Sequence, residues 1–363
     1  MQQLERFHGG NLNRASLKYG LPKEEIIDFS ANINPLGPSK EVTTALKNNL
    51  DLISRYPDPD CNELKTALSF YLGVHEKNIL MGNGAAELIY LFIRVAGFRQ
   101  ALIPVPTFSE YSLAVLSQGG EVLKINMHEK DGFNLPVDRI IDHFSPGKLL
   151  FLCNPNNPTG RVVNGRVMRL ILKEALSRGV FVLVDEAFMD FMSYRNYFSV
   201  MSLAEKQPNL AVLYSMTKFF GIPGLRLGAM VANEELVEKM KIAKDPWNVN
   251  ILAQVAGMAG LRDGVYMENT RRLVKRERKF LYRGLNGIAG LRPFPGAANF
   301  LLVKIVRAGM NSQELTDLIG RRGMLLRDCY GFSGLEGHFI RLAVKNRLEN
   351  KKILLALKSV LEG

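Results

Sequence analysis

The sequence predicts an α/β protein, in which a large domain with a mostly parallel, seven-stranded sheet is followed by a smaller α+β domain. Two patterns support this prediction. In the middle of the chain, short apolar runs alternate with helix-like stretches, which is typical of βα units whose parallel strands are buried on both faces. Towards the C-terminus, one long charged helical pattern is followed by separate strand patterns. A length of 363 residues agrees with about two domains.

Six short, largely apolar runs and one alternating segment, 121–126, are the candidate strands of the large domain. They span 78–81, 101–105, 121–126, 148–153, 180–185, 209–215 and 227–232. Helices are predicted from about Ala85 and after Pro106-Thr107. Ligands bind at the carboxyl ends of parallel strands, so the loops after these runs are where we expect the functional residues.

The small domain is predicted to begin with a basic helix over 267–283, whose arginines and lysines form a solvated face, and to contain separate strands. These strands span 299–305, 324–329 and 339–344. The start of the chain is loop-rich and too polar to fold alone, so we expect it to pack on the small domain and the active site. The predicted boundaries are 1–45 for this N-terminal arm, 46–262 for the large domain and 263–363 for the small domain.

Composition excludes several classes of protein. A hydrophobic fraction of 47% is too high for a disordered chain. The most apolar stretch, 88–98, is interrupted by Arg94 and is too short to span a membrane. No apolar leader is visible at the N-terminus, so no signal peptide is expected. The net charge of +12 is the unusual feature, because such a charge is also found in proteins that bind nucleic acids or anionic membranes.

Cysteine and histidine usage predicts a reducing compartment and no metal site. Cys61, Cys153 and Cys329 are spaced too widely for a disulfide framework or a zinc site. The chain has five histidines and no HExxH pair. We therefore expect a cytoplasmic protein.

The run Ser215-Met216-Thr217-Lys218 begins at the end of a predicted strand. A lysine among the apolar, glycine and proline residues that follow would be partly desolvated, which lowers its pKa and makes the amine nucleophilic. Ser215 and Arg226 flank this lysine and are suitable phosphate ligands. Taken alone, such a lysine is more often a solvated loop residue.

Three further motifs follow predicted strands. Asp185 ends an apolar run, where a carboxylate needs a cationic partner unless it caps a helix or binds a metal. Asn157 belongs to the second of two Asn-Pro steps in one short loop, which restrict the backbone, although an ordinary turn has the same composition. Gly82-Asn83-Gly84 precedes a helix, whose free N–H groups could bind an anion. Each signal alone also fits a purely structural role.

With these four motifs in this order, the chain resembles the fold type I, pyridoxal-phosphate-dependent aspartate aminotransferase superfamily from about Phe29 onward. The resemblance implies that Lys218 binds the pyridoxal 5'-phosphate aldehyde, that Asp185 pairs with the ring nitrogen and that Asn157 binds the ring 3′-oxygen. The implied phosphate ligands are Gly84, Ala85, Ser215 and Arg226. Further implied contacts are Phe108 stacked on the ring, Tyr56 of Arg55-Tyr56-Pro57 reaching the partner's site in a homodimer, and Arg341 on the substrate carboxylate.

Two branches of the superfamily are similar to this chain, the histidinol-phosphate aminotransferases and the threonine-phosphate decarboxylases of cobalamin biosynthesis. The segments His8-Gly9-Gly10-Asn11 and Asp28–Gly37 resemble the decarboxylases, and so does Phe188, where many aminotransferases carry tyrosine. This resemblance implies that the substrate is also bound by His8, Gly9, Asn32, Asn157 and Arg327.

The implied reaction is loss of carbon dioxide from L-threonine O-3-phosphate, which gives (R)-1-amino-2-propanol O-2-phosphate. Amino transfer from histidinol phosphate to 2-oxoglutarate is the alternative. A non-catalytic basic binding protein is a remote alternative, because the superfamily match leaves no segment for a nucleic-acid-binding domain. No nucleic-acid partner, membrane or metal is expected; the partners are a small phosphorylated amino acid and a second copy of the chain.

Overall fold

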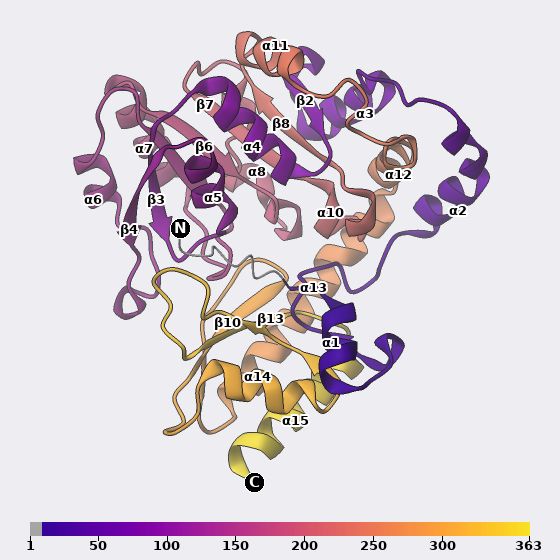
Figure 1. Cartoon of the computed structure of the whole chain (residues 1–363), viewed down its shortest axis with the longest axis vertical. Coiled ribbons are helices and arrows are strands. Elements are labelled where there is room, and N and C mark those ends of the chain that lie inside the picture. Colours follow the sequence, from indigo (N-terminus) through magenta and orange to yellow (C-terminus); the bar gives the residue numbers. More distant parts are fainter. Residues whose placement is uncertain (1–8) are drawn as a thin grey trace.

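The structure, a computed structural model, describes residues 9–363. Figure 1 shows two lobes: the upper one contains strands β2 to β8, and the lower one contains β10, β13 and the C-terminal helices. The long helix α13 (Gly264–Asn286) runs between them. Within this part of the chain, no helix is long and apolar enough to cross a membrane.

The large sheet has seven strands in the order β2-β8-β7-β6-β5-β3-β4. Six of the strands run in one direction and only β8 runs in the other, so the prediction of a mostly parallel sheet is confirmed. The strands are β2 (Ile79–Gly82), β3 (Gln100–Val105), β4 (Glu121–Asn126), β5 (Leu149–Cys153), β6 (Phe181–Asp185), β7 (Leu210–Ser215) and β8 (Gly228–Ala232). Their bounds lie within one residue of the predicted runs at each end.

Successive side chains of the central strands enter different cores, because side chains alternate across a sheet. In β6, Val182 and Val184 contribute to one core and Leu183 to the other. Helices α3, α7 and α12 cover the first face, and α4, α5 and α11 cover the second. This double burial explains why the strands appear in the sequence as uninterrupted apolar runs.

The large lobe contains eleven α-helices among the described residues. They are α2 (Lys40–Asn48), α3 (Asn62–Leu72), α4 (Ala85–Ala96), α5 (Glu110–Ser117), α6 (Val137–Asp142), α7 (Gly165–Ser177), α8 (Arg195–Phe198), α9 (Met201–Ala204), α10 (Met216–Phe219), α11 (Glu234–Ala243) and α12 (Ile251–Arg262). Short 3₁₀ turns connect several of them; they are η2 (Leu50–Ser54), η3 (Glu76–Asn78), η4 (Glu129–Asp131), η5 (Met189–Phe191) and η6 (Pro223–Leu225).

The lower lobe is built on an antiparallel sheet in the order β12-β13-β10-β9, packed against helices. Its elements are β9 (Leu291–Pro293), β10 (Phe300–Ile305), α14 (Ser312–Gly320), β12 (Arg327–Asp328), β13 (Phe339–Ala343) and α15 (Arg347–Glu362). The single strand predicted over 324–329 is two short strands. The first, β11 (Met324–Leu325), pairs with β1 (Ile27–Asp28), whereas β12 pairs with β13, so the chain changes sheets at Leu326.

The N-terminal segment packs on the lower lobe. It contains α1 (Leu12–Tyr19), the 3₁₀ turn η1 (Lys23–Glu25) and β1. Lys18 forms an ion pair with Asp317 of α14 at 2.8 Å, and the fully buried Phe29 belongs to the lower core. Figure 1 shows α1 beside the lower lobe, far from most of the large sheet.

Helix α13 belongs to both lobes. Its first half contributes Met267 and Val274 to a core of the large lobe, and its second half contributes Leu281 and Leu285 to the core of the lower one. The domain boundary predicted after residue 262 falls at the start of this shared helix and remains a prediction.

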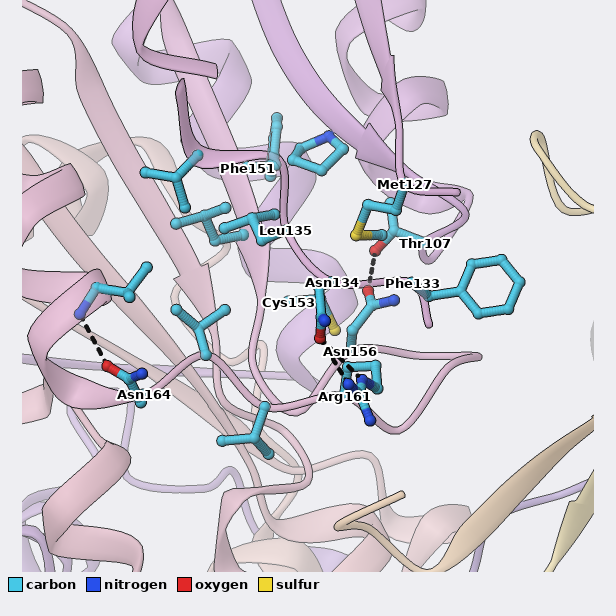
Figure 2. A pocket seen from close by; sticks show the side chains of 16 residues that line it. Thr107, Met127, Phe133, Asn134, Leu135, Phe151, Cys153, Asn156, Arg161 and Asn164 are labelled. Carbon is cyan, nitrogen blue, oxygen red and sulfur yellow. Dashed lines mark hydrogen bonds between the residues drawn. The ribbon is translucent and has the colours of Figure 1, made fainter. Parts of the chain in front are cut away.

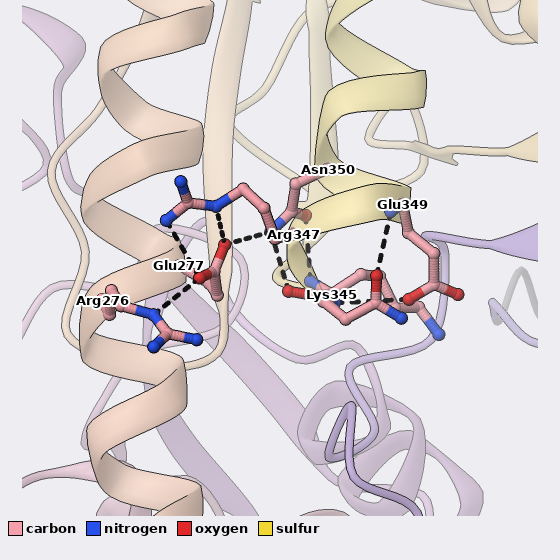
Figure 3. A network of polar contacts seen from close by, with 7 residues as sticks. Arg276, Glu277, Lys345, Arg347, Glu349 and Asn350 are labelled. Atoms are coloured by element: carbon pink, nitrogen blue, oxygen red, sulfur yellow. Dashed lines mark hydrogen bonds and ion pairs between the residues drawn. The ribbon is translucent and has the colours of Figure 1, made fainter.

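A buried carboxylate fixes α13 to α15. Figure 3 shows Glu277, whose side chain is fully buried, between Arg276 and Arg347. Arg347 donates to it through Nε at 2.8 Å and through Nη2 at 3.1 Å. Burial alone would raise the pKa of Glu277, but the hydrogen bonds from Arg347 and Arg276 outweigh burial and lower the pKa. The ionised carboxylate therefore links the two helices.

Candidate active site

A cavity of about 380 Å³ lies between the two lobes at the carboxyl ends of the central strands. Both lobes and the N-terminal segment contribute to its wall. The residues predicted from the sequence that line it are Gly9, Asn32, Ala85, Phe108, Asn157, Asp185, Ser215, Lys218, Arg226, Arg327 and Arg341. Positions separated by more than 300 residues are thus brought to one cavity.

Lys218 lies on the one-turn helix α10 directly after β7. Asn34 holds this turn in place, because its N–H donates to the Lys218 carbonyl at 3.0 Å and its amide donates to the Phe219 carbonyl at 2.6 Å. Burial, helped by the positive charges of Arg226 and Arg341, lowers the pKa of Lys218 to about 8. A larger fraction of this amine than of an ordinary lysine is therefore uncharged and nucleophilic near neutral pH.

Asp185 ends β6 and its side chain is buried. Its Oδ1 accepts a hydrogen bond from the Ala187 N–H at 2.9 Å, and its Oδ2 accepts one from the Tyr111 hydroxyl at 2.6 Å. Burial raises the pKa of Asp185, while these two hydrogen bonds and the charge of Lys218 oppose that rise. A cationic ligand group would stabilise the ionised carboxylate further.

The N-terminus of α4, Ser215 and Arg226 together form an anion-binding site. Gly84 precedes α4 with φ +81° and provides no side-chain cap, so the first N–H groups of the helix are available to a ligand. A Cβ atom on Gly84 would lie 2.5 Å from Arg226 Nη2, so only glycine lets the guanidinium approach this closely. Ser215 Oγ lies 2.8 Å from Thr217 Oγ1, beside Lys218.

Arg341 lies in the middle of β13 and its side chain is buried. One terminal nitrogen donates to Asn157 Oδ1, and the other donates to the Ser30 carbonyl at 2.7 Å. Its Nε is buried and has no hydrogen-bond partner among the described residues; the same is true of Asn32 Oδ1. Unpaired buried polar atoms are costly, so a ligand that pairs with them would be stabilised.

Arg327 is the direct cross-strand partner of Arg341 in the antiparallel pair β12–β13. Two like charges placed opposite each other in a sheet repel, and here burial lowers the pKa of both guanidinium groups, that of Arg341 to about 10. An anionic ligand in the cavity would relieve this repulsion. This part of the cavity wall is therefore suited to a ligand with negative charge.

Three predicted residues are not among the residues that line the cavity. Gly84 lies one position before Ala85 and contacts the site through Arg226. Tyr56 is 77% exposed and packs against Trp247, with ring centroids 4.7 Å apart. His8 lies outside the described residues.

A second cavity, of about 320 Å³, lies behind the loop that carries Asn157. Figure 2 shows that its polar side chains already hydrogen bond one another: Thr107 with Asn156, and Arg161 with Asn134. Apolar residues such as Leu135 and Phe151 form most of the remaining wall. These contacts hold the loop in place, and Asn157 faces the first cavity instead.

Several residues of the cavity wall escaped the motif-based prediction. Tyr111 bonds Asp185, Ser30 bonds Arg341, and Thr217 and Phe332 complete the wall. Thr217 lies two residues from Ser215 in a motif that was otherwise recognised, so hydroxyl spacing could have indicated it. Tyr111 and Phe332 carry no comparable local signal, since each reaches the site only through tertiary packing.

Comparison with known proteins shows the same architecture. The family described as aminotransferase class I and II matches residues 24–358. The threonine-phosphate decarboxylase of Salmonella typhimurium is 36% identical over 98% of this chain and 97% of its own length. The solved histidinol-phosphate aminotransferase of Clostridium acetobutylicum has a TM-score of 0.86 and 31% identity, covering 93% of this chain and 99% of that one. The solved L-threonine-O-3-phosphate decarboxylase of Porphyromonas gingivalis has a TM-score of 0.81 and 26% identity, covering 93% of this chain and 100% of that one.

Proposed function

Because the chain belongs to the aminotransferase class I and II family, we propose that it is a pyridoxal-phosphate-dependent enzyme that decarboxylates L-threonine O-3-phosphate. The reaction breaks the bond between Cα and the carboxylate carbon, releases carbon dioxide and adds one proton at Cα. Its product is (R)-1-amino-2-propanol O-2-phosphate, an intermediate of cobalamin biosynthesis. The near full-length similarity to the Salmonella decarboxylase supports this assignment.

The residues of the cavity fit pyridoxal phosphate. The uncapped start of α4, Ser215 and Arg226 offer N–H, hydroxyl and guanidinium donors for its phosphate. The buried carboxylate of Asp185 offers a partner for a protonated ring nitrogen, and Lys218 offers an amine for its aldehyde. When bound, the cofactor would supply an aldehyde that captures the substrate amine and a ring that withdraws electrons from Cα.

We assign the remaining roles to this chain's own side chains. Asn157, held by Arg341, would bind the ring oxygen, and Phe108 would cover one face of the ring. Lys218, with a pKa of about 8, can deliver a proton to Cα after carbon dioxide has left. Phe188, which packs edge-to-face on Phe300, lines the same cavity without contributing a hydroxyl group.

The observation that carries the substrate assignment is the cross-strand pair Arg327–Arg341 in the cavity wall. Threonine phosphate has two anionic groups, a carboxylate and a phosphate, and two arginines from paired positions in the cavity wall suit such a substrate. Arg341 would hold the carboxylate and Arg327 the distal phosphate, with Gly9 and Asn32 close by. Binding energy at the phosphate would then orient the Cα–carboxylate bond against the ring. A contact from His8 remains a prediction.

We further propose a homodimer in which Tyr56 contacts the partner's cofactor phosphate. Tyr56 and Trp247 are both exposed large aromatic residues that lie against each other. Their exposure is consistent with a contact made outside the chain's own cavity.

The decisive experiment supplies the pyridoxal-phosphate-loaded protein with L-threonine O-3-phosphate. We expect carbon dioxide release and, by ³¹P nuclear magnetic resonance, the aminopropanol phosphate, without consumption of added 2-oxoglutarate. O-phosphoserine in a parallel reaction measures selectivity for the methyl group, which is worth only about 1–3 kcal/mol. The Lys218→Ala variant is the inactive control.

The histidinol-phosphate aminotransferase alternative predicts a different outcome. That enzyme would convert histidinol phosphate and 2-oxoglutarate to glutamate without releasing carbon dioxide. Amino transfer of this kind, with threonine phosphate left unchanged, would overturn the proposed function.

A further inference from the structure

We propose that Tyr111 is a positioning residue that acts through Asp185: its hydroxyl orients the buried carboxylate towards the ring nitrogen of the bound cofactor. This inference rests on the proposed function, because it assumes that pyridoxal phosphate occupies the cavity. No sequence motif indicated Tyr111. The inference follows from one hydrogen bond and from the packing around it.

The hydroxyl of Tyr111 donates to Asp185 Oδ2 at 2.6 Å, and both side chains are buried. Tyr111 comes from α5 and Asp185 from the end of β6, so the hydrogen bond joins a helix that covers the sheet to the centre of the sheet. A short bond from a hydroxyl to a carboxylate is among the stronger hydrogen bonds in proteins. Removing this hydrogen bond would therefore destabilise the ionised form of the Asp185 carboxylate.

The ring of Tyr111 is held on two sides. It stacks on Phe151 with centroids 4.9 Å apart and an interplanar angle of 14°, and it meets Phe108 edge-to-face at 5.6 Å. Phe108 is the residue expected to cover the cofactor ring. The hydroxyl therefore has little freedom to leave Asp185, and the same aromatic cluster borders the cofactor site.

The carboxylate of Asp185 is fixed at both oxygens. Oδ1 accepts from the Ala187 N–H at 2.9 Å while Oδ2 accepts from Tyr111, so rotation about the terminal bond would break both contacts. Each carboxylate oxygen has a second acceptor position, which leaves room for a cationic N–H of a ligand. Burial raises the pKa of Asp185, and several interactions lower it again. The hydrogen bond from Tyr111 is the largest of these.

The Tyr111→Phe variant tests this role, because it deletes the hydroxyl and keeps the aromatic packing. The cofactor-loaded protein should contain ¹⁵N-labelled pyridoxal phosphate, whose ring-nitrogen resonance reports protonation directly. We expect this resonance to move towards the unprotonated position, kcat to fall roughly tenfold, and the acid limb of the pH profile to move up by about one pH unit. The direction follows because the carboxylate becomes easier to protonate.

Two comparisons separate positioning from a merely structural role. Tyr71 also donates to a buried aspartate, Asp190, at 2.9 Å, but Asp190 does not line the cavity. Tyr71→Phe should therefore change neither the nitrogen resonance nor the pH profile. In an Asp185→Asn background, Tyr111→Phe should have no further effect on the resonance, because a residue that acts through Asp185 needs that carboxylate.

A second substitution at position 111 keeps the proposal testable if Tyr111→Phe folds poorly, because its expected effect has the opposite sign. 3-Fluorotyrosine at position 111 has a more acidic phenol and is a stronger donor, so both readouts should move in the opposite direction. An unchanged nitrogen resonance and pH profile in Tyr111→Phe would overturn the proposal. The resonance requires only bound cofactor, so it can be read whatever the substrate is; a wild-type protein that binds no pyridoxal phosphate would instead refute the proposed function.

Discussion

Single residues of the site adopt conformations and pairings that local sequence does not dictate. Arg226 has a left-handed backbone with φ 57°, which residues other than glycine rarely adopt. This conformation accompanies the close approach of its guanidinium to Gly84. Arg341 is likewise held by Asn157 and Ser30, from two other segments. Such strain and long-range pairing are expected where a ligand site is preorganised.

The lowered pKa of Lys218 makes a prediction about cofactor binding. Only the uncharged amine attacks an aldehyde, so the rate at which the cofactor-free protein captures pyridoxal phosphate should rise about tenfold per pH unit below pH 8. Above that pH the rate should level off. Stopped-flow absorbance between pH 6 and pH 9 measures this rate.

A lysine with an ordinary pKa, 10.5, would show no plateau in that range. Such a continuous rise would contradict the burial argument. Lys218→Ala should show no covalent capture at any pH.

At the scale of elements, the start of α4 differs from the starts of the helices that asparagine caps. Asparagine side chains accept hydrogen bonds from the first turns of α7, α11, α12, α14 and α15. Helix α4 begins at Gly84 without such a cap. An asparagine cap satisfies N–H groups that would otherwise need a partner, so the uncapped start of α4, which borders the cavity at Ala85, can offer these groups to an anion.

The ion pairs of Glu277 with Arg276 and Arg347 predict how much this link between α13 and α15 contributes to the stability of the protein. Glu277→Gln keeps the shape but loses the charge, so we expect the free energy of unfolding to fall by about 1.5–3 kcal/mol at pH 7. Because the pKa of Glu277 is lowered from 4.5 in the folded state, its contribution is complete above about pH 4.5 and is lost as the pH falls through the folded value.

Urea titrations at pH 7 and at lower pH measure both effects. Glu268→Gln is the matched control, because Glu268 lies on the same helix and pairs with Arg272 in a largely exposed ion pair. The prediction is contradicted if the two variants lose the same stability at pH 7. It is also contradicted if the stability lost in Glu277→Gln is just as large at low pH.

At the scale of the whole molecule, the basic charge is only partly a solvated face. Most basic residues of the helix predicted over 267–283 are exposed, as predicted; these are Arg272, Lys275, Arg276, Lys279 and Arg283. Two are not: Arg271 donates to the Asp190 carbonyl at 3.0 Å, and Arg278 donates to the Ala298 carbonyl at 2.9 Å. Arg271 thus fixes α13 to η5 of the large lobe, and Arg278 fixes it to the segment before β10. Other positive charges, such as Arg327 and Arg341, face the cavity.

The proposed homodimer predicts complementation between two inactive variants. In a hybrid of Lys218→Ala and Tyr56→Ala subunits, one site combines the intact lysine with the partner's intact tyrosine. Random pairing makes roughly half of the dimers hybrids, each with one complete site, so about a quarter of wild-type activity should return. Mixing after partial denaturation, followed by a carbon dioxide assay, measures this recovery. An inactive mixture that contains hybrid dimers would exclude a shared site.

The strand patterns and the order of the motifs were sufficient to predict the seven strands, the family and eleven of the residues that line the cavity. This succeeds because buried parallel strands, glycine turns and a lysine at a strand end are local features that follow from backbone geometry. The division of 324–329 between two sheets, the register that opposes Arg327 to Arg341 and the hydrogen bond from Tyr111 to Asp185 required the folded chain. Each depends on which distant segments pack together, and pairing of that kind leaves no periodic trace in either partner's own sequence.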